Sequence, residues 1–245
     1  MPEPAQVTLT FMPYDVVPLK TTTSVADIVT HLDVWIVEGS NTLEFHQSAT
    51  DANFGTLTAT FDKTKTYTIY AVGHKADGAT LTDGIISFTD DKVTHAMYYT
   101  TTFSPATTTS LSCLMNRIVA DFRLEIADEI PANVAKMKFT ITGVYDRWNV
   151  ATGGTHQIDR VSTVAYNGSA SIFNIYAIVT DAETTHTVAI EALDANDAVI
   201  QSRTFNDVPL RNGYKTTYRG PFFIDTDVSA SFVCEDWSSY DTVNF

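Results

Sequence analysis

Apolar and polar residues alternate along short stretches of this chain with a period of two. Val7, Leu9 and Phe11 are separated by single threonines, and the same pattern returns at residues 56–61 and 137–142. Successive side chains of a β-strand point to opposite faces, so each stretch has one apolar face and one hydroxyl-bearing or polar face. Antiparallel sheets that cover a core on one side and meet water on the other have this pattern.

Turn signals separate these stretches and indicate tight hairpins. Asn-Gly and Asp-Gly pairs accept the positive φ that such turns require. Helical signal is confined to one or two turns after Ser24, with Asp27 in the first turn, and a short turn after Pro131. Further strands are predicted at residues 32–37, 67–72, 98–103, 118–124, 161–166, 171–178, 187–193, 200–205, 216–222 and 229–234.

Many short strands with turns between them predict an all-β sandwich or barrel and argue against a βαβ fold. The chain has 245 residues, of which 44% are hydrophobic, and one sandwich takes about 100 residues. A polar segment with Pro105, residues 104–112, is the best candidate for a join. We therefore expect two antiparallel β-sandwich domains in tandem, formed by residues 1–110 and 111–245.

Charge narrows the choice of partners. Fifteen basic residues stand against 29 acidic ones, for a formal net charge of −14. Such a surface repels polyanions, so neither nucleic acid nor an anionic membrane face is expected as a partner. No apolar run reaches the 18 residues of a membrane helix. The first four residues are polar and do not resemble a signal peptide, so a leader for export would have been removed or would lie outside this sequence.

Reactive motifs are missing from the sequence. Its six histidines are scattered, and it has neither a nucleophile elbow nor a glycine-rich phosphate loop. Asp194 and Asn196 begin like a calcium loop, but the glycine and the final glutamate of that motif are absent, which favours a simple turn. We expect no catalytic residues, no cofactor and no metal.

The sequence allows two interpretations of Trp148, as a glycan contact or as a packed residue. Trp35 lies in an apolar strand and is predicted to be core, whereas Trp148 follows a polar stretch and is the better candidate for exposure and for contact with a glycan. Packing in a core or a domain interface is the competing fate of Trp148.

Cys113 and Cys234 either form a disulfide that joins the first and last strands of the second domain, or are two unpaired small hydrophobes.

Five segments of the chain form a pattern when they are taken in order: residues 32–39 (LDVWIVEG), 67–73 (YTIYAVG), 116–122 (NRIVADF), 130–134 (IPANV) and 208–220 (VPLRNGYKTTYRG). Together they resemble fimbrillin-type proteins of Bacteroidales. The resemblance spans most of the chain, and order and spacing carry it more than any single motif does.

That resemblance implies two transthyretin-like, Greek-key β-sandwich domains, export as a lipoprotein precursor, and a place at the cell surface or outer membrane. It implies assembly into a fimbria (pilus) by β-strand exchange with other fimbrial subunits, with host or bacterial surface ligands as further candidate partners. Membrane attachment would come only from a lipid anchor outside these residues. Val7, Leu9 and Phe11 then mark a candidate exchangeable strand, which we expect to be in place in the intact chain.

Shaft subunits of this family lose their first strand after cleavage at a basic residue. In this sequence no arginine precedes Arg117, and Lys20 is the candidate processing position. An anchor that keeps its first strand and a shaft subunit therefore both remain open. The alternative function is a non-catalytic surface lipoprotein that binds glycan through exposed aromatic residues around Trp148.

Overall fold

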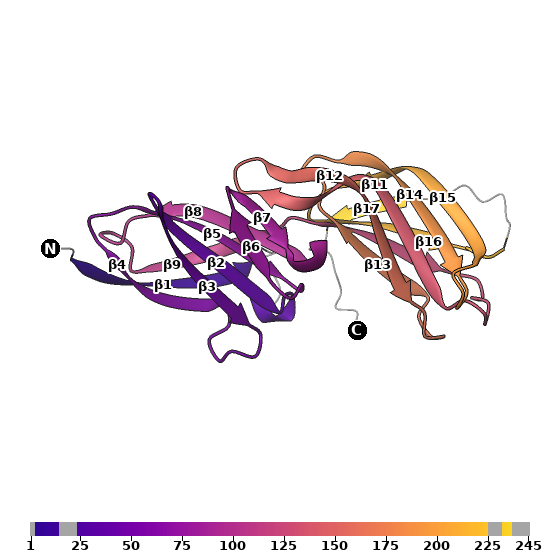
Figure 1. The fold of residues 1–245 in the computed structure, drawn as a ribbon, viewed down its shortest axis with the longest axis horizontal. Coiled ribbons are helices and arrows are strands. Elements are labelled where there is room, and N and C mark those ends of the chain that lie inside the picture. The colour runs from indigo at the N-terminus through magenta and orange to yellow at the C-terminus, as the bar shows by residue number, and fades with distance from the viewer. Residues whose placement is uncertain (1–2, 15–23, 225–231, 237–245) are drawn as a thin grey trace. The chain divides into compact units, whose positions relative to one another are not determined.

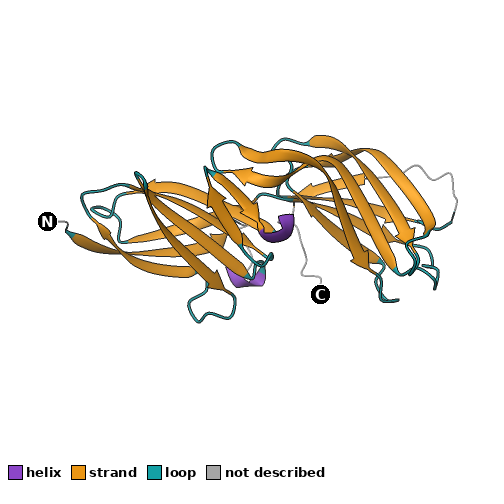
Figure 2. Cartoon of the chain, viewed as in Figure 1, coloured by secondary structure: helices purple, strands orange, loops and turns teal. Residues whose placement is uncertain are grey.

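The computed structural model describes residues 3–14, 24–224 and 232–236, and it is built almost entirely from β-strands (Figures 1 and 2). The chain divides into two compact units. Unit 1 comprises Met1–Ile118 with Trp148–Gly153, and unit 2 comprises Val119–Arg147 with Gly154–Phe245. Among the described residues, no helix is long and apolar enough to cross a bilayer.

Unit 1 is a β-sandwich whose strands form one continuous seven-stranded sheet in the order β3-β2-β5-β8-β9-β1-β4. It also contains a hairpin, β6–β7, and two short 3-10 helices, η1 (Val25–Asp27) and η2 (Thr89–Asp91). Its strands are β1 (Pro4–Pro13), β2 (His31–Glu38), β3 (Asn41–Ser48), β4 (Thr56–Asp62), β5 (Tyr67–His74), β6 (Ala79–Thr82), β7 (Ile85–Phe88), β8 (Ala96–Phe103) and β9 (Ser110–Arg117).

Strand β9 makes the sheet of unit 1 fold back on itself. Its first part pairs in parallel with β1, and its last two residues, Asn116 and Arg117, pair with β8. The β4-β1-β9 layer can therefore face the β8-β5-β2-β3 layer. The core between them contains Leu9 and Met115 from one layer and Leu32 and Ile69 from the other, all fully buried.

Unit 2 is a second sandwich with its own core. One layer has the order β13-β10-β16-β17, and in the other layer β14 pairs with both β11 and β15, while β12 pairs with β11. Phe122 and Phe139, one from each layer, are fully buried in the core. The strands are β10 (Ala120–Ile126), β11 (Lys136–Asn149), β12 (Gly153–Ala165), β13 (Ile172–Ala177), β14 (Thr184–Leu193), β15 (Val199–Leu210), β16 (Tyr214–Gly220) and β17 (Phe232–Asp236). The end of β11 from Trp148 and the first residue of β12 belong to unit 1.

The all-β prediction is confirmed, and so are several of its local details. The short helical segment predicted after Ser24 is η1, and the structure adds that Ser24 caps it and forms a capping box with Asp27. Asp83 and Gly84 both have positive φ and form the two-residue turn of the β6–β7 hairpin.

The predicted domain boundary is wrong in position. The units divide at Ile118/Val119, because the polar segment assigned to the join runs into β9, which belongs to unit 1. The polar residues of 107–112 resemble a linker in composition. From Ser110 onward they form a strand because β1 offers a parallel partner, which is a tertiary effect that overrides local sequence.

Candidate functional site: the first strand between its two partners

Strand β1 lies inside its layer, with a hydrogen-bonded neighbour on each side. It runs antiparallel to β4, with Val7 opposite Ala59 and Leu9 opposite Leu57. It runs parallel to β9, with Phe11 opposite Cys113. β1 therefore fills a central position of the β4-β1-β9 layer and not its edge.

The alternation read from the sequence fixes which face of β1 turns inward. Val7 and Leu9 are fully buried, Phe11 is 2% exposed, and the threonines between them are half-buried on the other face. Burying one such apolar side chain contributes roughly 1.5–3 kcal/mol. The three together therefore contribute several kcal/mol to unit 1, and the prediction that this strand is in place in the intact chain is confirmed.

Two further backbone hydrogen bonds hold the C-terminal end of β1. The N–H of Phe11 donates to the carbonyl of Gly55 at 2.8 Å, and the N–H of Tyr14 donates to the carbonyl of Met115 at 2.8 Å. Gly55 has a φ of +84°, and a Cβ at this position would come within 2.7 Å of the Val25 side chain. Glycine therefore lets the β4 end, η1 and the end of β1 pack together.

Removing β1 would leave the two strands beside it without partners along facing edges. The inward carbonyl and amide groups of β4 and β9 would then face a slot with apolar walls, including Leu57 and Met115. Unpaired edges of this kind template a new strand, and alternate pockets select its side chains. Lys20, the candidate processing position, lies outside the described residues.

Trp148 does not occupy the exposed loop predicted for it. It is the penultimate residue of β11, is only 8% exposed, and its ring packs 5.6 Å from that of Tyr98. The Tyr98 hydroxyl also donates to the carbonyl of Val150 at 3.2 Å. Contact with a glycan through Trp148 is therefore wrong, because a residue 50 positions earlier covers the ring. Trp35, predicted as core, is 2% exposed in β2.

The two cysteines do not pair. Cys113 is buried in β9 of unit 1 and Cys234 is half-buried in β17 of unit 2, and both are free thiols. The disulfide within the second domain is thus wrong, since Cys113 does not belong to that domain. Burial raises the pKa of Cys113 to about 12, against a smaller opposing effect of a hydrogen bond with Tyr99, and burial also raises the pKa of Cys234.

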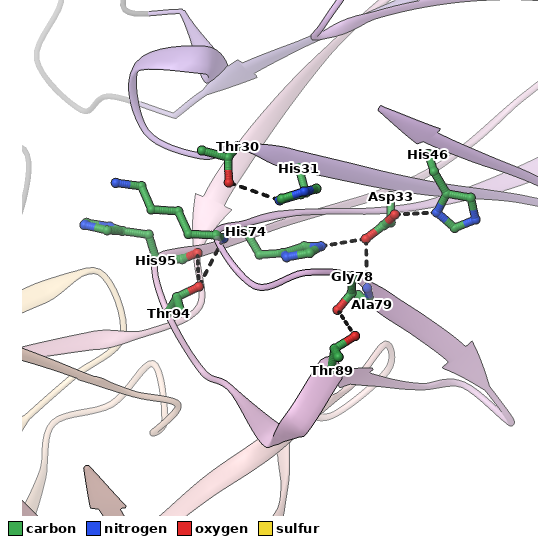
Figure 3. A network of polar contacts seen from close by, with 11 residues as sticks. Thr30, His31, Asp33, His46, His74, Gly78, Ala79, Thr89, Thr94 and His95 are labelled. Carbon is green, nitrogen blue, oxygen red and sulfur yellow. Dashed lines mark hydrogen bonds and ion pairs between the residues drawn. The ribbon is translucent and has the colours of Figure 1, made fainter. Parts of the chain in front are cut away.

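A buried carboxylate, Asp33, lies at the centre of a polar cluster of unit 1 (Figure 3). Asp33 of β2 accepts hydrogen bonds from His74 Nε2 of β5 at 2.6 Å and from His46 Nδ1 of β3 at 2.5 Å. The N–H of Ala79 in β6 adds a third at 3.1 Å. Asp33 points away from the main core, so the cluster links three sheet strands to the β6–β7 hairpin on their outer face.

Electrostatics keep Asp33 charged despite its burial. Burial alone would raise its pKa, but hydrogen bonds from His74 and His46, together with the attraction of these rings, hold the pKa below its usual value. The His74 side chain is fully buried, stacks on His31 at 5.6 Å, and its Nδ1 has no partner among the described residues. Of Asp33, His46 and His74, only His46, at 59% exposure, is open to a solute. The cluster therefore has a structural role, in which it ties β2, β3 and β5 to the β6–β7 hairpin. We call this cluster of Asp33, His46 and His74 the clasp.

The segment at Asp194, which begins like a calcium loop in the sequence, forms a turn in the structure. The Asp194 carboxylate accepts the N–H groups of Asn196 and Ala198 at 2.8 and 2.9 Å, which is the turn chemistry expected from the sequence. In the described parts of the chain, no group of three or more histidine, cysteine, aspartate or glutamate side chains is arranged to hold a metal ion.

Replacing Asp33 tests the clasp. Asp33→Asn should lower the free energy of unfolding by about 2–3 kcal/mol at neutral pH, the scale of buried hydrogen bonds to a charged group. Because the folded-state pKa of Asp33 is depressed, its contribution is present above the unfolded pKa and is lost as pH falls through the lower folded value. The difference between wild type and variant should therefore shrink below about pH 4.

The matched control is Asp90→Asn, an exposed aspartate with positive φ that asparagine tolerates. It should change stability by less than about 0.5 kcal/mol. Denaturant unfolding at several pH values measures both variants. Equal stability of Asp33→Asn and wild type at pH 7 would refute the clasp.

Thiol titration tests the free cysteines. A disulfide reagent such as Ellman's reagent should label Cys234 in the native protein and reach Cys113 only after unfolding, because burial keeps Cys113 protonated and inaccessible. Without any reductant, the unfolded protein should release two equivalents of the reporter. Release of none would show that the cysteines are paired after all.

Comparison with known proteins identifies the fold. No protein-family model and no curated protein sequence matches the chain. Solved structures do match over nearly their whole length. A proposed adhesin from Bacteroides ovatus has a TM-score of 0.56 at 13% identity, covering 94% of this chain and 96% of its own.

Two further structures have the same fold. A fimbrial assembly protein from Parabacteroides distasonis has a TM-score of 0.51 at 12% identity and covers 98% of each chain. A proposed polysaccharide-binding protein from Bacteroides thetaiotaomicron has a TM-score of 0.55 at 10% identity, covering 95% of this chain and 96% of its own. At such identities, the likeness establishes that this chain has the all-β fold of these proteins.

Proposed function

We propose that this chain is a structural component of a bacterial surface fimbria, as a subunit or an anchor, and that it assembles by exchanging a β-strand with a neighbouring subunit. The observation that carries the proposal is the position of β1, whose Val7, Leu9 and Phe11 fill the core between β4 and β9. Solved structures with this fold include proteins described as adhesins and as a fimbrial assembly protein, which supports a role at the cell surface.

Strand exchange requires a segment that one chain can lose and another can supply. β1 (Pro4–Pro13) precedes its partners β4 and β9 in the chain, so a single cut after it would separate it from both of them. An exchanged strand would regain the pairing with β4 and β9 through main-chain hydrogen bonds, and its alternate side chains would fill the vacated pockets. In an anchor β1 would stay in place, and the chain would pair with its neighbour through another strand. Export as a lipoprotein and a transthyretin-like topology belong to this proposal.

The same proposal includes a non-catalytic role. Its support is that the titratable cluster around Asp33 is closed, with His74 inside and only His46 at the surface. A glycan partner stays a candidate because one protein of this fold is described as polysaccharide-binding. Trp148 is no longer a candidate contact for such a glycan, because it is buried against Tyr98.

A protein cut after folding tests the exchange. A specific protease site placed between residues 15 and 23 lets β1 be severed while it is still held between β4 and β9. A labelled peptide of residues 3–14 should then enter the cut protein at least tenfold faster than the uncut protein, because only the severed strand can leave without unfolding unit 1. Gel filtration with fluorescence detection measures the incorporation.

Two controls separate specific exchange from sticking. The same peptide with Val7, Leu9 and Phe11 replaced by serine should not be incorporated, because it cannot fill the apolar pockets. Without any peptide, the cut protein should form ladders that grow with concentration, because a strand that is still attached to a second copy enters the slot left by β1. The proposal would be contradicted by a cut protein that remains monomeric and does not take up the unsubstituted peptide.

A further inference from the structure

Unit 2 contains an open cleft of about 730 Å³ where β11 changes partners. β11 pairs with β14 as far as Ile141 opposite Val188, and then Tyr145 bridges to Ile178. Between these points the strand kinks at Gly143, which has a φ of +69°. The strands separate there, and small-molecule sites commonly have volumes of about 300–1,000 Å³.

The walls of the cleft are rich in groups that both donate and accept hydrogen bonds. Four of the eleven lining residues are threonines, and Asp159 is the only Asp, Glu, Lys or Arg among the eleven. The lining residues are Thr142, Gly143, Tyr145, Gln157, Ile158, Asp159, Val179, Thr180, Thr184, Thr185 and His186. With one carboxylate and no lysine or arginine, this lining disfavours an anionic ligand.

Hydrogen bonds within the cleft fix its polar side chains in place. Gly143 donates its N–H to Asp159 Oδ1 at 3.0 Å and accepts from Gln157 Nε2 at 3.0 Å, so the kinked residue holds both. The imidazole of His186 is held at both of its nitrogens. Its Nδ1 donates to the Thr142 carbonyl at 2.8 Å, and its Nε2 accepts from the Thr184 hydroxyl at 2.8 Å. Groups held in this way lose little entropy when a ligand binds.

Tyr145 supplies an aromatic surface beside these polar groups. Its ring lies against the backbone of Gly154, where a Cβ would come within 2.6 Å of the ring. Glycine at this position therefore lets the ring lie close to the strand. Ile158 and Val179 add apolar surface to the lining. The cleft thus combines an aromatic and aliphatic side with a hydroxyl, amide and carboxylate side.

We propose that this cleft of unit 2 binds a neutral saccharide. A sugar ring has hydroxyls that donate and accept around its rim, which matches the threonines, Gln157 and Asp159, and C–H faces that pack on Tyr145. The carboxylate of Asp159 retains acceptor capacity beyond its bond from Gly143, since an ionised carboxylate has about four lone-pair sites. The site is independent of β1, which belongs to unit 1.

Glycan binding by the intact protein tests this proposal. The probe is a printed array of neutral and acidic oligosaccharides, followed by saturation-transfer NMR and calorimetry with the neutral sugars that bind. The test variant is Thr185→Trp, which fills the cleft from an exposed position on β14. It should weaken binding at least tenfold. The matched control is Thr163→Trp, an exposed threonine of β12 outside the lining, which should leave binding unchanged.

Gln157→Ala provides a second variant that removes a polar group without filling space, and it should weaken binding severalfold. Unchanged melting temperatures show that the variants are folded. The proposal is overturned by an array on which no neutral glycan binds, by a preference for acidic glycans, or by neutral-glycan binding that Thr185→Trp leaves intact. None of these results bears on strand exchange, which has its own readout in the cut protein.

Discussion

Unit 1 depends on the pairing of β1 with strands on both of its sides. Either neighbour alone would leave one row of backbone groups unpaired next to a buried apolar face, and unsatisfied buried backbone groups are costly. The pairing also holds β9 in its turn from one layer to the other, because its first part pairs with β1 and its last residues pair with β8. One segment of ten residues therefore closes the sandwich.

Unit 2 uses the same arrangement with a different consequence. β10 runs antiparallel to β13 and parallel to β16, as β1 does with β4 and β9. β10 is internal to the chain, with Val119 before it and β11 after it, so a single cut cannot release it. β1, the equivalent strand of unit 1, precedes both of its partners, so a single cut after it separates it from them along the chain. The two sandwiches thus differ in how their central strand is connected.

Sequence patterns could predict the strands that have one buried and one wet face, and β1 is the clearest case. β3 could not be predicted from the sequence, because an edge strand with mostly polar, exposed side chains lacks the alternation that marks a half-buried strand. β9 resembles a linker until its partner β1 is known. Capping and turn residues such as Ser24 and Gly84 could be identified because their chemistry is local.

The candidate sites depended more on contacts between distant residues. Trp148 follows a polar stretch, and only the position of Tyr98 explains its burial. Asp33, His46 and His74 come from three strands whose adjacency no spacing in the sequence indicates. The cleft in unit 2 arises from a change of strand partner at Gly143, which a single sequence does not encode in any recognisable motif.

The structure of the assembled form, obtained by cryo-electron microscopy after β1 has been severed, would test the central claim most directly. Strand exchange predicts a strand from a neighbouring chain between β4 and β9, antiparallel to the first and parallel to the second, with apolar side chains in the positions of Val7, Leu9 and Phe11. An assembly in which each chain keeps its own β1 in that slot, and contacts its neighbours only through side chains, would contradict it.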